Sequence, residues 1–271
     1  MEAVSDSQST CPPRLVDFAE ELAGMAAAVA RSYFRTSVSI DTKGDESPVT
    51  IADRTAEQRM REAISQRFPD HGVFGEEFGV DNPDADYIWV LDPIDGTKAF
   101  ITGNPLFGTL VALLHKGRPL LGVIEMPALG ERWIGAAGHP SRRRDANGLQ
   151  DVRVRPCPDL GKAIMRTTSP DMFQGPQAGA YTSLEQACSL TLYGGDCFCY
   201  GQLASGFVDL VVESSLKPYD FMAALPVVTG AGAMATDWQG RPLTLDSAGD
   251  VLVAGDPAVH ARALALLSGK T

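Results

Sequence analysis

Two aspartates, a main-chain carbonyl and a hydroxyl stand close together in the run LDPIDGT at residues 91–97. Asp92 and Asp95 are three positions apart, so a turn can aim both carboxylates and the carbonyl of Ile94 into one small space. Thr97 adds its hydroxyl. A ligand set made of oxygens alone suits a hard divalent cation, Mg²⁺ before Zn²⁺. The run therefore predicts a magnesium site, and a strand followed by a capped turn is the alternative interpretation.

The residues before this run predict the strand that positions it. Residues 87–91 are apolar or aromatic, which favours a buried strand. Pro93 cannot donate a hydrogen bond to a sheet, so we expect the strand to end at Asp92. Gly96 then allows close approach of the main chain.

Further acids stand at the ends of other predicted elements. They are Asp53, Glu76, Glu77 and Asp220. Thr50 is predicted to cap a helix over residues 51–68, with Asp53 in its first turn. Glu76 and Glu77 end a short predicted strand at 72–77. Each acid taken alone is explained by helix capping or an exposed turn. Packed together they would raise one another's pKa values, which two or three Mg²⁺ ions would prevent.

Such a site fits the hydrolysis of phosphate monoesters. One metal ion can activate a water molecule, and a second can stabilise the leaving oxygen. The patterns GxSxG, GxxxxGK[ST] and HExxH are absent from the sequence. The four histidines are scattered, and we interpret each as structural or surface. The residues thus predict a Mg²⁺-dependent phosphomonoesterase.

The bulk composition narrows the class of protein further. Of 271 residues, 44% are hydrophobic, and the formal net charge is -11. A full core is therefore expected, whereas nucleic-acid binding would need clustered positive charge. The sequence contains neither a secretory leader nor an apolar run long enough for a bilayer, and its five cysteines include no CxxC pair. We expect a cytoplasmic protein with no membrane or nucleic-acid partner.

The order of predicted elements indicates an α/β fold with sheets covered by helices. We expect one domain, residues 1–271, with two layered halves of approximately 14–150 and 151–271. The predicted helices cover residues 15–34, 51–68, 183–189, 197–205, 220–228 and 257–267. The predicted strands beyond the central run cover residues 107–114, 119–125, 131–137, 152–154, 163–166, 190–193, 207–212 and 251–254. The polar stretch that contains Arg142, Arg143 and Arg144 is predicted to be solvated surface, and a phosphate or subunit contact is the alternative.

Three motifs in this order resemble the inositol monophosphatase superfamily of Mg²⁺-dependent phosphatases. They are the Gly75-Glu-Glu77 run, the LDPIDGT run and the later Asp220. The resemblance covers nearly the whole chain from Lys43 onward. It implies the α-β-α-β-α sandwich shared with fructose-1,6-bisphosphatase, and usually a homodimer. Residues 98–109, 130–133, 193–196 and 216–220 are most similar to the bacterial histidinol-phosphate phosphatases of this superfamily.

The resemblance also implies which residues hold the metal ions. Glu76, Asp92 and the carbonyl of Ile94 would hold the first Mg²⁺. Asp92, Asp95 and Asp220 would hold the second, and a third, weaker ion would share Glu76.

The remaining roles concern water and substrate. Asp53 and Thr97 would orient the attacking water near Glu76, and the turn from Ile94 to Thr97 would receive the phosphate. The resemblance implies a substrate site made of Glu76, Ile94, Asp95, Gly96, Thr97, Gly195, Asp196, Glu213 and Asp220. Lys43 and Glu77 complete the set of candidates.

The alcohol portion of the substrate is predicted from the same motifs. Glu213 and the turn from Gly194 to Asp196 would contact it, and we infer that Asp196 or Glu213 pairs with a substrate ammonium group. Many inositol monophosphatases have Trp where this chain has Tyr219, which disfavours inositol phosphate.

We therefore predict hydrolysis of L-histidinol phosphate to L-histidinol and phosphate in histidine biosynthesis. Inositol 1-phosphate, sugar phosphates and 3'-phosphonucleotides are the alternative substrates. A binding or regulatory protein on the same fold, acting through RNA, is a rival of another class, and the complete acidic set and the negative charge disfavour it. A Ca²⁺-binding structural module is disfavoured because the EF-hand loop pattern is missing.

Overall fold

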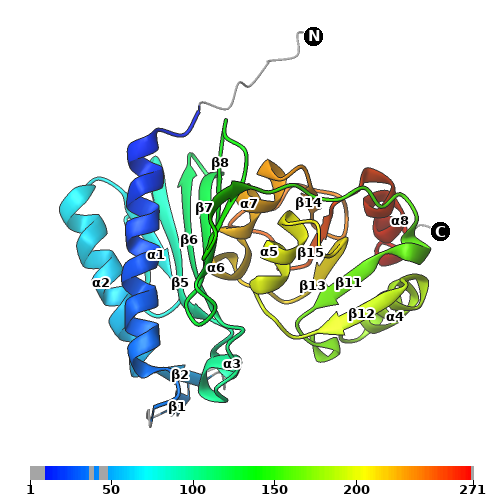
Figure 1. Ribbon diagram of the computed structural model, residues 1–271, viewed down its shortest axis with the longest axis horizontal. Coiled ribbons are helices and arrows are strands. Elements are labelled where there is room, and N and C mark those ends of the chain that lie inside the picture. Colours follow the sequence, from blue (N-terminus) through cyan, green and yellow to red (C-terminus); the bar gives the residue numbers. More distant parts are fainter. Residues whose placement is uncertain (1–9, 37–39, 43–47, 270–271) are drawn as a thin grey trace.

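Five layers of secondary structure make up the molecule. The computed structural model describes residues 10–36, 40–42 and 48–269. From left to right, Figure 1 shows two helices, a large sheet, a central group of short helices, a smaller sheet and two further helices. The α-β-α-β-α sandwich expected from the sequence is confirmed.

The large sheet has eight strands in the spatial order β10-β9-β8-β7-β6-β5-β3-β4. Its strands are β3 (Gly72–Gly75), β4 (Gly79–Asp81), β5 (Tyr87–Asp95), β6 (Gly108–His115), β7 (Arg118–Met126), β8 (Glu131–Ala136), β9 (Arg142–Asp145) and β10 (Gly148–Asp151). Strand β3 runs parallel to β5, whereas β5 and β6 are antiparallel. Because side chains alternate along β5, Trp89 and Leu91 pack under the outer helices α1 (Pro13–Tyr33) and α2 (Ile51–Arg67).

The other face of β5 packs on the central layer, which consists of α5 (Phe198–Ala204), α6 (Pro218–Phe221) and α7 (Ala224–Gly230). Helix α7 lies so close to the sheet that only glycine fits at two positions. A Cβ added at Gly122 would lie 2.0 Å from the carbonyl oxygen of Ala223, and one at Gly135 would lie 2.2 Å from that of Pro226. This close packing brings the chain after residue 213 against the first sheet.

The smaller sheet has five strands in the order β12-β11-β13-β15-β14. They are β11 (Ile164–Thr167), β12 (Leu190–Tyr193), β13 (Leu210–Glu213), β14 (Met234–Thr236) and β15 (Val251–Ala254). Val211 faces the central layer, whereas Leu210 and Val212 pack under α4 (Pro176–Ala187) and α8 (Pro257–Leu267). The central strands of both sheets are thus buried on two faces, which explains their apolar sequences.

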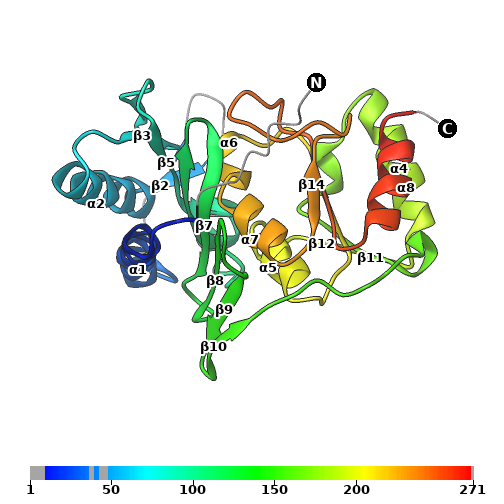
Figure 2. The same cartoon turned by 90° about the horizontal axis from the view of Figure 1, so that it is seen from above.

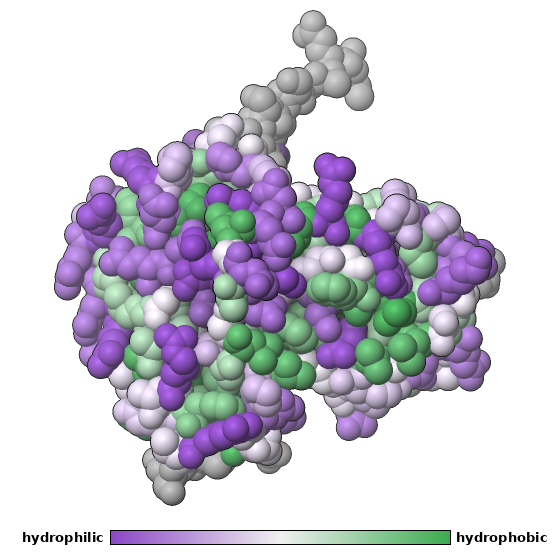
Figure 3. Space-filling view, viewed as in Figure 1, coloured by the Kyte–Doolittle hydropathy of each residue, from purple (hydrophilic) through white to green (hydrophobic). Residues whose placement is uncertain are grey.

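Several short elements complete the chain. They are β1 (Ile40–Thr42) paired with β2 (Pro48–Thr50), α3 (Thr97–Ile101), and the 3₁₀ turns η1 (Leu160–Lys162) and η2 (Pro170–Met172). Figure 2 shows the segment after β10 crossing from the large sheet to β11. Hydrophilic side chains cover the outer helices on the left of Figure 3, and hydrophobic ones form small patches elsewhere on that face. Within the described residues, none of the helices has the length and apolar character needed to cross a membrane.

The strand through the central motif is longer than predicted. Strand β5 continues past Pro93 to Asp95, so the expected end at Asp92 is wrong. The register with β6 shifts between Asp92 and Asp95, and the carbonyl of Pro93 accepts the Thr109 hydroxyl at 2.8 Å. Proline is tolerated because it lies in this irregularity, where the missing N–H leaves no ladder bond broken.

Other predicted elements also differ from the structure. Helix α4 starts at Pro176 rather than at residue 183, and α6 and α7 replace one predicted helix. Residues 152–154 form no strand, and the N–H groups of Val152 and Val154 donate to the carbonyls of Ser141 and Ala231 instead. The stretch with Arg142–Arg144 forms the β9-β10 hairpin, in which Arg143 pairs with Asp145 and Arg144 with Glu20. Strand β14 was not predicted, because its three residues are too few to show a strand period.

Candidate active site

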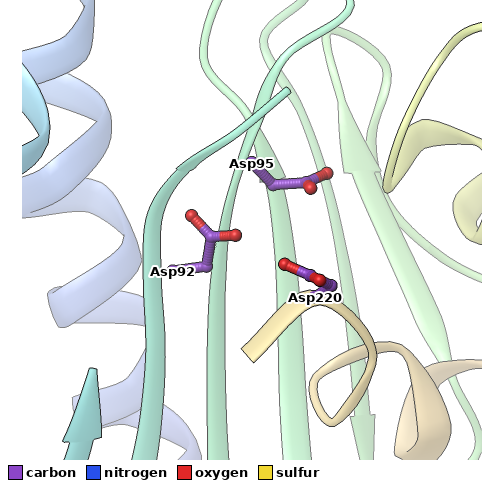
Figure 4. Close-up of side chains that lie close together, drawn as sticks. All are labelled: Asp92, Asp95 and Asp220. Carbon is purple, nitrogen blue, oxygen red and sulfur yellow. The ribbon is translucent and has the colours of Figure 1, made fainter. Parts of the chain in front are cut away.

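Three carboxylates from two elements meet beside the end of β5. Ligand oxygens of Asp92, Asp95 and Asp220 all lie within 4.8 Å of one another, and Figure 4 shows the side chains converging. The register shift in β5 brings Asp92 and Asp95 to the same region of space. Asp220 comes from α6, where the Lys217 N–H donates to its Oδ2 at 2.6 Å. The sequence prediction that these three acids act together agrees with this geometry.

Two more predicted acids surround this cluster. Glu76 follows β3 in a turn, and its carboxyl interacts with that of Asp92. Asp53 lies in the first turn of α2, where Thr50 caps the helix and donates its N–H to Asp53 Oδ2 at 2.8 Å. The helix capping that the sequence allowed as an alternative explanation for this acid is therefore present. Its other oxygen, Oδ1, is buried without a hydrogen-bond partner.

The crowding makes these carboxyl groups hard to ionise. Burial, followed by the charges of Glu76 and Asp95, raises the pKa of Asp92 well above its usual range. Burial likewise raises the pKa of Asp95 well above its usual range, and that of Asp220 to about 7. Burial raises the pKa of Asp53 to about 6, although its bonds to Thr50 oppose the change. A charge-neutralising partner is therefore required for all of them to be carboxylates at neutral pH.

The donor set fits a divalent cation. Asp92 is buried, and its Oδ1 has no hydrogen-bond partner. A buried oxygen without a donor is rare in folded proteins, and it is the kind of atom that a cation satisfies. The cluster offers carboxylate oxygens, which hard cations such as Mg²⁺ prefer. These observations fit the metal site that the sequence predicts.

The turn after β5 connects the acid cluster to α3. Gly96 has φ +78°, and a Cβ there would lie 2.9 Å from Asp196 Oδ2. The Thr97 hydroxyl donates to the carbonyl of Ile94 at 3.1 Å. On the far side, the Cys197 N–H donates to Asp95 Oδ2 at 2.7 Å, which ties the start of α5 to the cluster. Residues predicted from two distant parts of the sequence thus contact each other here.

A cavity of about 180 Å³ opens beside the cluster. It is lined by Asp95, Thr168, Met172, Asp196, Cys197, Tyr200, Glu213, Leu216 and Asp220. Glu213 is buried, and Thr168 donates to its Oε1 through the N–H at 2.9 Å and the hydroxyl at 3.1 Å. Its Oε2 has no partner. Burial raises the pKa of Glu213 to about 8 and that of Asp196 to about 6.

The structure adds cavity residues that the sequence did not indicate. Thr168, Met172 and Tyr200 stand in no recognisable motif, and no local signal distinguishes them from ordinary packing residues. Tyr200 is buried with its hydroxyl unpartnered. Of the predicted site residues, Lys43 lies outside the described residues. Gly195 does not line the cavity, and a Cβ added there would lie 2.5 Å from Arg166 Nη2. Glu77 donates its N–H to Glu57 at 2.7 Å.

Comparison with known proteins places this geometry in a family. The model of the inositol monophosphatase family matches residues 13–270. The bifunctional phosphatase IMPL2 of Arabidopsis thaliana is 47% identical over 97% of this chain and 78% of its own. A histidinol-phosphatase of Chlorobaculum parvum is 34% identical over 93% of this chain and 96% of its own.

Comparison with a solved structure indicates the same family. An inositol monophosphatase from Zymomonas mobilis is similar with a TM-score of 0.86 and 46% identity, covering 94% of this chain and 98% of its own. The family model and the similar structures cover almost all of the chain, and the acid cluster lies within the part that they match. The chain therefore belongs to the inositol monophosphatase family and is a phosphatase.

Proposed function

We propose that this phosphatase hydrolyses L-histidinol phosphate to L-histidinol and phosphate in histidine biosynthesis. The observation that carries the proposal is the cavity beside the acid cluster. Among the described residues that line it, four are acids and none is basic. Two of these acids, Asp196 and Glu213, are not assigned to a metal ion and are left to meet the alcohol. A cavity of this kind favours an alcohol that bears a positive charge over a neutral polyol.

We assign the metal ions as the family resemblance implies. Glu76, Asp92 and the Ile94 carbonyl would hold one Mg²⁺, Asp92, Asp95 and Asp220 a second, and a third would share Glu76. Bound Mg²⁺ would neutralise the acids and the phosphate and lower the pKa of the attacking water.

The chain itself would orient the water. The Thr97 hydroxyl donates its hydrogen bond to the carbonyl of Ile94, so the lone pairs of its oxygen are available to accept from a water molecule. Asp53 is held through Oδ2, which leaves Oδ1 as a second acceptor. The water oxygen bonds to phosphorus, the ester P–O bond breaks, and the alcohol oxygen leaves with one proton. The turn from Ile94 to Thr97, with Gly96 at its centre, would receive the phosphate.

The alcohol would be recognised by the two acids of the cavity wall. Glu213 Oε2 is buried without a partner, so a substrate ammonium group would satisfy it. Asp196, in the turn after Gly195, would face the same group. Relatives named histidinol-phosphatase in Chlorobaculum parvum, Streptomyces coelicolor and Mycobacterium tuberculosis, each 34% identical to this chain, support this substrate.

Inositol 1-phosphate is the second candidate substrate. It is favoured by the name of the Zymomonas mobilis structure, which is 46% identical to this chain. Sugar phosphates and 3'-phosphonucleotides stay in the same group of alternatives.

The test is phosphate release from L-histidinol phosphate and from inositol 1-phosphate, each with Mg²⁺ and with a chelator. We expect Mg²⁺-dependent release that favours histidinol phosphate and is lost in Asp92→Asn. Asp84→Asn, an exposed residue away from the cluster, is the matched control and should keep full activity. A preference for inositol 1-phosphate would overturn the proposed substrate, and release that persists in the presence of the chelator would overturn the role of Mg²⁺.

Four further expectations stay predictions: the homodimer, the cytoplasmic location, the absence of nucleic-acid and membrane partners, and the single domain built of two halves. Size-exclusion chromatography with light scattering would test the first of them.

A further inference from the structure

Helix α2 carries a second acid that faces the site region, Glu57, one turn after Asp53. Its side chain is fully buried, and it contacts no residue of the acid cluster in the bonds described. It instead accepts two main-chain N–H groups of the turn between β3 and β4. The Glu77 N–H donates to Oε2 at 2.7 Å, and the Phe78 N–H donates to Oε1 at 3.2 Å.

Arg61, one further turn along α2, completes this arrangement. Its Nε donates to Glu57 Oε1 at 2.8 Å, Nη1 donates to Asp81 at 2.7 Å, and Nη2 donates to the carbonyl of Gly79. The guanidinium group therefore joins the carboxylate to the far side of the same turn. Only 13% of the Arg61 side chain is exposed, so water competes little for these bonds.

The turn held in this way is the one that carries Glu76. Its start is closed by the bond from the Glu76 N–H to the Leu91 carbonyl at 3.2 Å. Glu57 lies so near the end of β3 that a Cβ at Gly75 would be 2.0 Å from Oε1. The main chain is thus fixed immediately before and after Glu76, whose carboxyl interacts with Asp92.

We propose that Glu57 is a positioning residue, which acts through the turn at residues 76–78 to set the orientation of Glu76 and hence the affinity for the metal ion. The inference rests on the proposed role of Glu76 as a metal ligand. Replacing groups that orient a metal ligand typically weakens metal binding on the order of 10- to 100-fold.

The test is the binding of Mn²⁺ alone to the metal-free full chain, followed by the electron paramagnetic resonance signal of the free ion. In Glu57→Gln, the amide nitrogen must face an N–H donor of the turn or of Arg61, so the turn loses one of its bonds. We expect Mn²⁺ affinity to fall about tenfold or more. With saturating Mg²⁺, KM for the phosphate ester should change little, because the metal site is then filled and Glu57 itself does not line the cavity.

Asp209→Asn is the matched control. Asp209 is equally buried, accepts the Ile164 N–H at 2.8 Å and pairs with Arg155, but it lies directly before β13, in another part of the molecule. It should lose stability while binding Mn²⁺ as the unmodified chain does. Arg61→Lys keeps the charge beside Glu57 and removes the forked contacts, so its Mn²⁺ affinity should fall between those of Glu57→Gln and the unmodified chain.

Each outcome decides the inference. Unchanged Mn²⁺ affinity in Glu57→Gln overturns it, and so does an equal loss in Asp209→Asn, which would indicate general destabilisation. If Glu57→Gln does not fold, Arg61→Lys decides by the same measurement. If the unmodified chain binds no Mn²⁺, the metal site in the proposed function fails instead.

Discussion

Glu213 has one carboxylate oxygen satisfied by Thr168 and the other buried without a partner. An unsatisfied buried oxygen costs free energy in the unliganded protein, and a ligand that donates a hydrogen bond to it recovers that cost. This imbalance makes Glu213 the residue on which substrate choice should depend most.

Glu213→Gln should therefore change the two substrates unequally. We expect KM for histidinol phosphate to rise on the order of 10- to 100-fold, the size of a lost charge-assisted hydrogen bond. The amide oxygen can still accept from Thr168, so the fold should be retained. Steady-state kinetics with histidinol phosphate and a neutral-alcohol phosphate would check this. An equal rise in KM for both would show that Glu213 does not recognise charge.

The turn between β5 and α3 shows how one element brings a motif into place. Gly96 adopts φ +78°, which side-chain-bearing residues rarely adopt, and Asp196 occupies the space that its side chain would need. The close contact allows the turn and the wall of the cavity to form one continuous site.

Gly96→Ala should accordingly lower both stability and activity. The backbone conformation alone costs roughly 1–2 kcal/mol, and displacement of Asp196 should reduce kcat/KM on the order of tenfold or more. Gly117→Ala is the matched control, since Gly117 has φ +75° with no atom within 4 Å of the added Cβ. It should lose similar stability in thermal unfolding while keeping full kcat/KM. Equal activity in both variants would contradict the role of the turn.

At the scale of the whole molecule, acids from both sheets and from the central layer between them meet at the site. Asp92 and Asp95 come from the large sheet, Asp196 and Asp220 from the central region and Glu213 from the smaller sheet. Burial raises the pKa of every one of these acids in the metal-free protein. A raised folded-state pKa stabilises the protein below the unfolded-state pKa, near 4, and this stabilisation is lost as pH rises through the folded-state value.

The metal-free chain should therefore unfold at a lower temperature at about pH 8.5 than at about pH 6, because the pKa of Asp220 is about 7 and that of Glu213 about 8. Under the proposed metal assignment, Mg²⁺ would bind only the ionised carboxylates, so it should raise Tm more at the higher pH. Calorimetry with chelator and with Mg²⁺ would measure both effects.

Asp92→Asn should be more stable than the unmodified chain without metal at about pH 8.5 and should lose most of the response to Mg²⁺. A Mg²⁺ effect independent of pH would contradict this account.

The sequence by itself determined the features that depend on near neighbours. The Thr50–Asp53 cap, the turn at Gly96 and the outer helix α1 follow from local hydrogen bonds, a local φ and the spacing of apolar residues. The two aspartates of the LDPIDGT run stand close along the chain, so their shared chemistry was predictable. Asp220 and Glu213 were found because their motifs resemble those of a known family.

Only the tertiary structure decided how the layers meet. Apolar periodicity indicates which face of a strand is buried, but it does not specify the partner on that face. Thr168, Tyr200 and Met172 came to the cavity through the packing of the smaller sheet and α5. Glu57 was indistinguishable from a surface helix residue until its contacts with the turn at residues 76–78 were known. Strand β5 continued through Pro93 because the irregular pairing with β6 removed the need for its N–H, a condition set by the neighbouring strand.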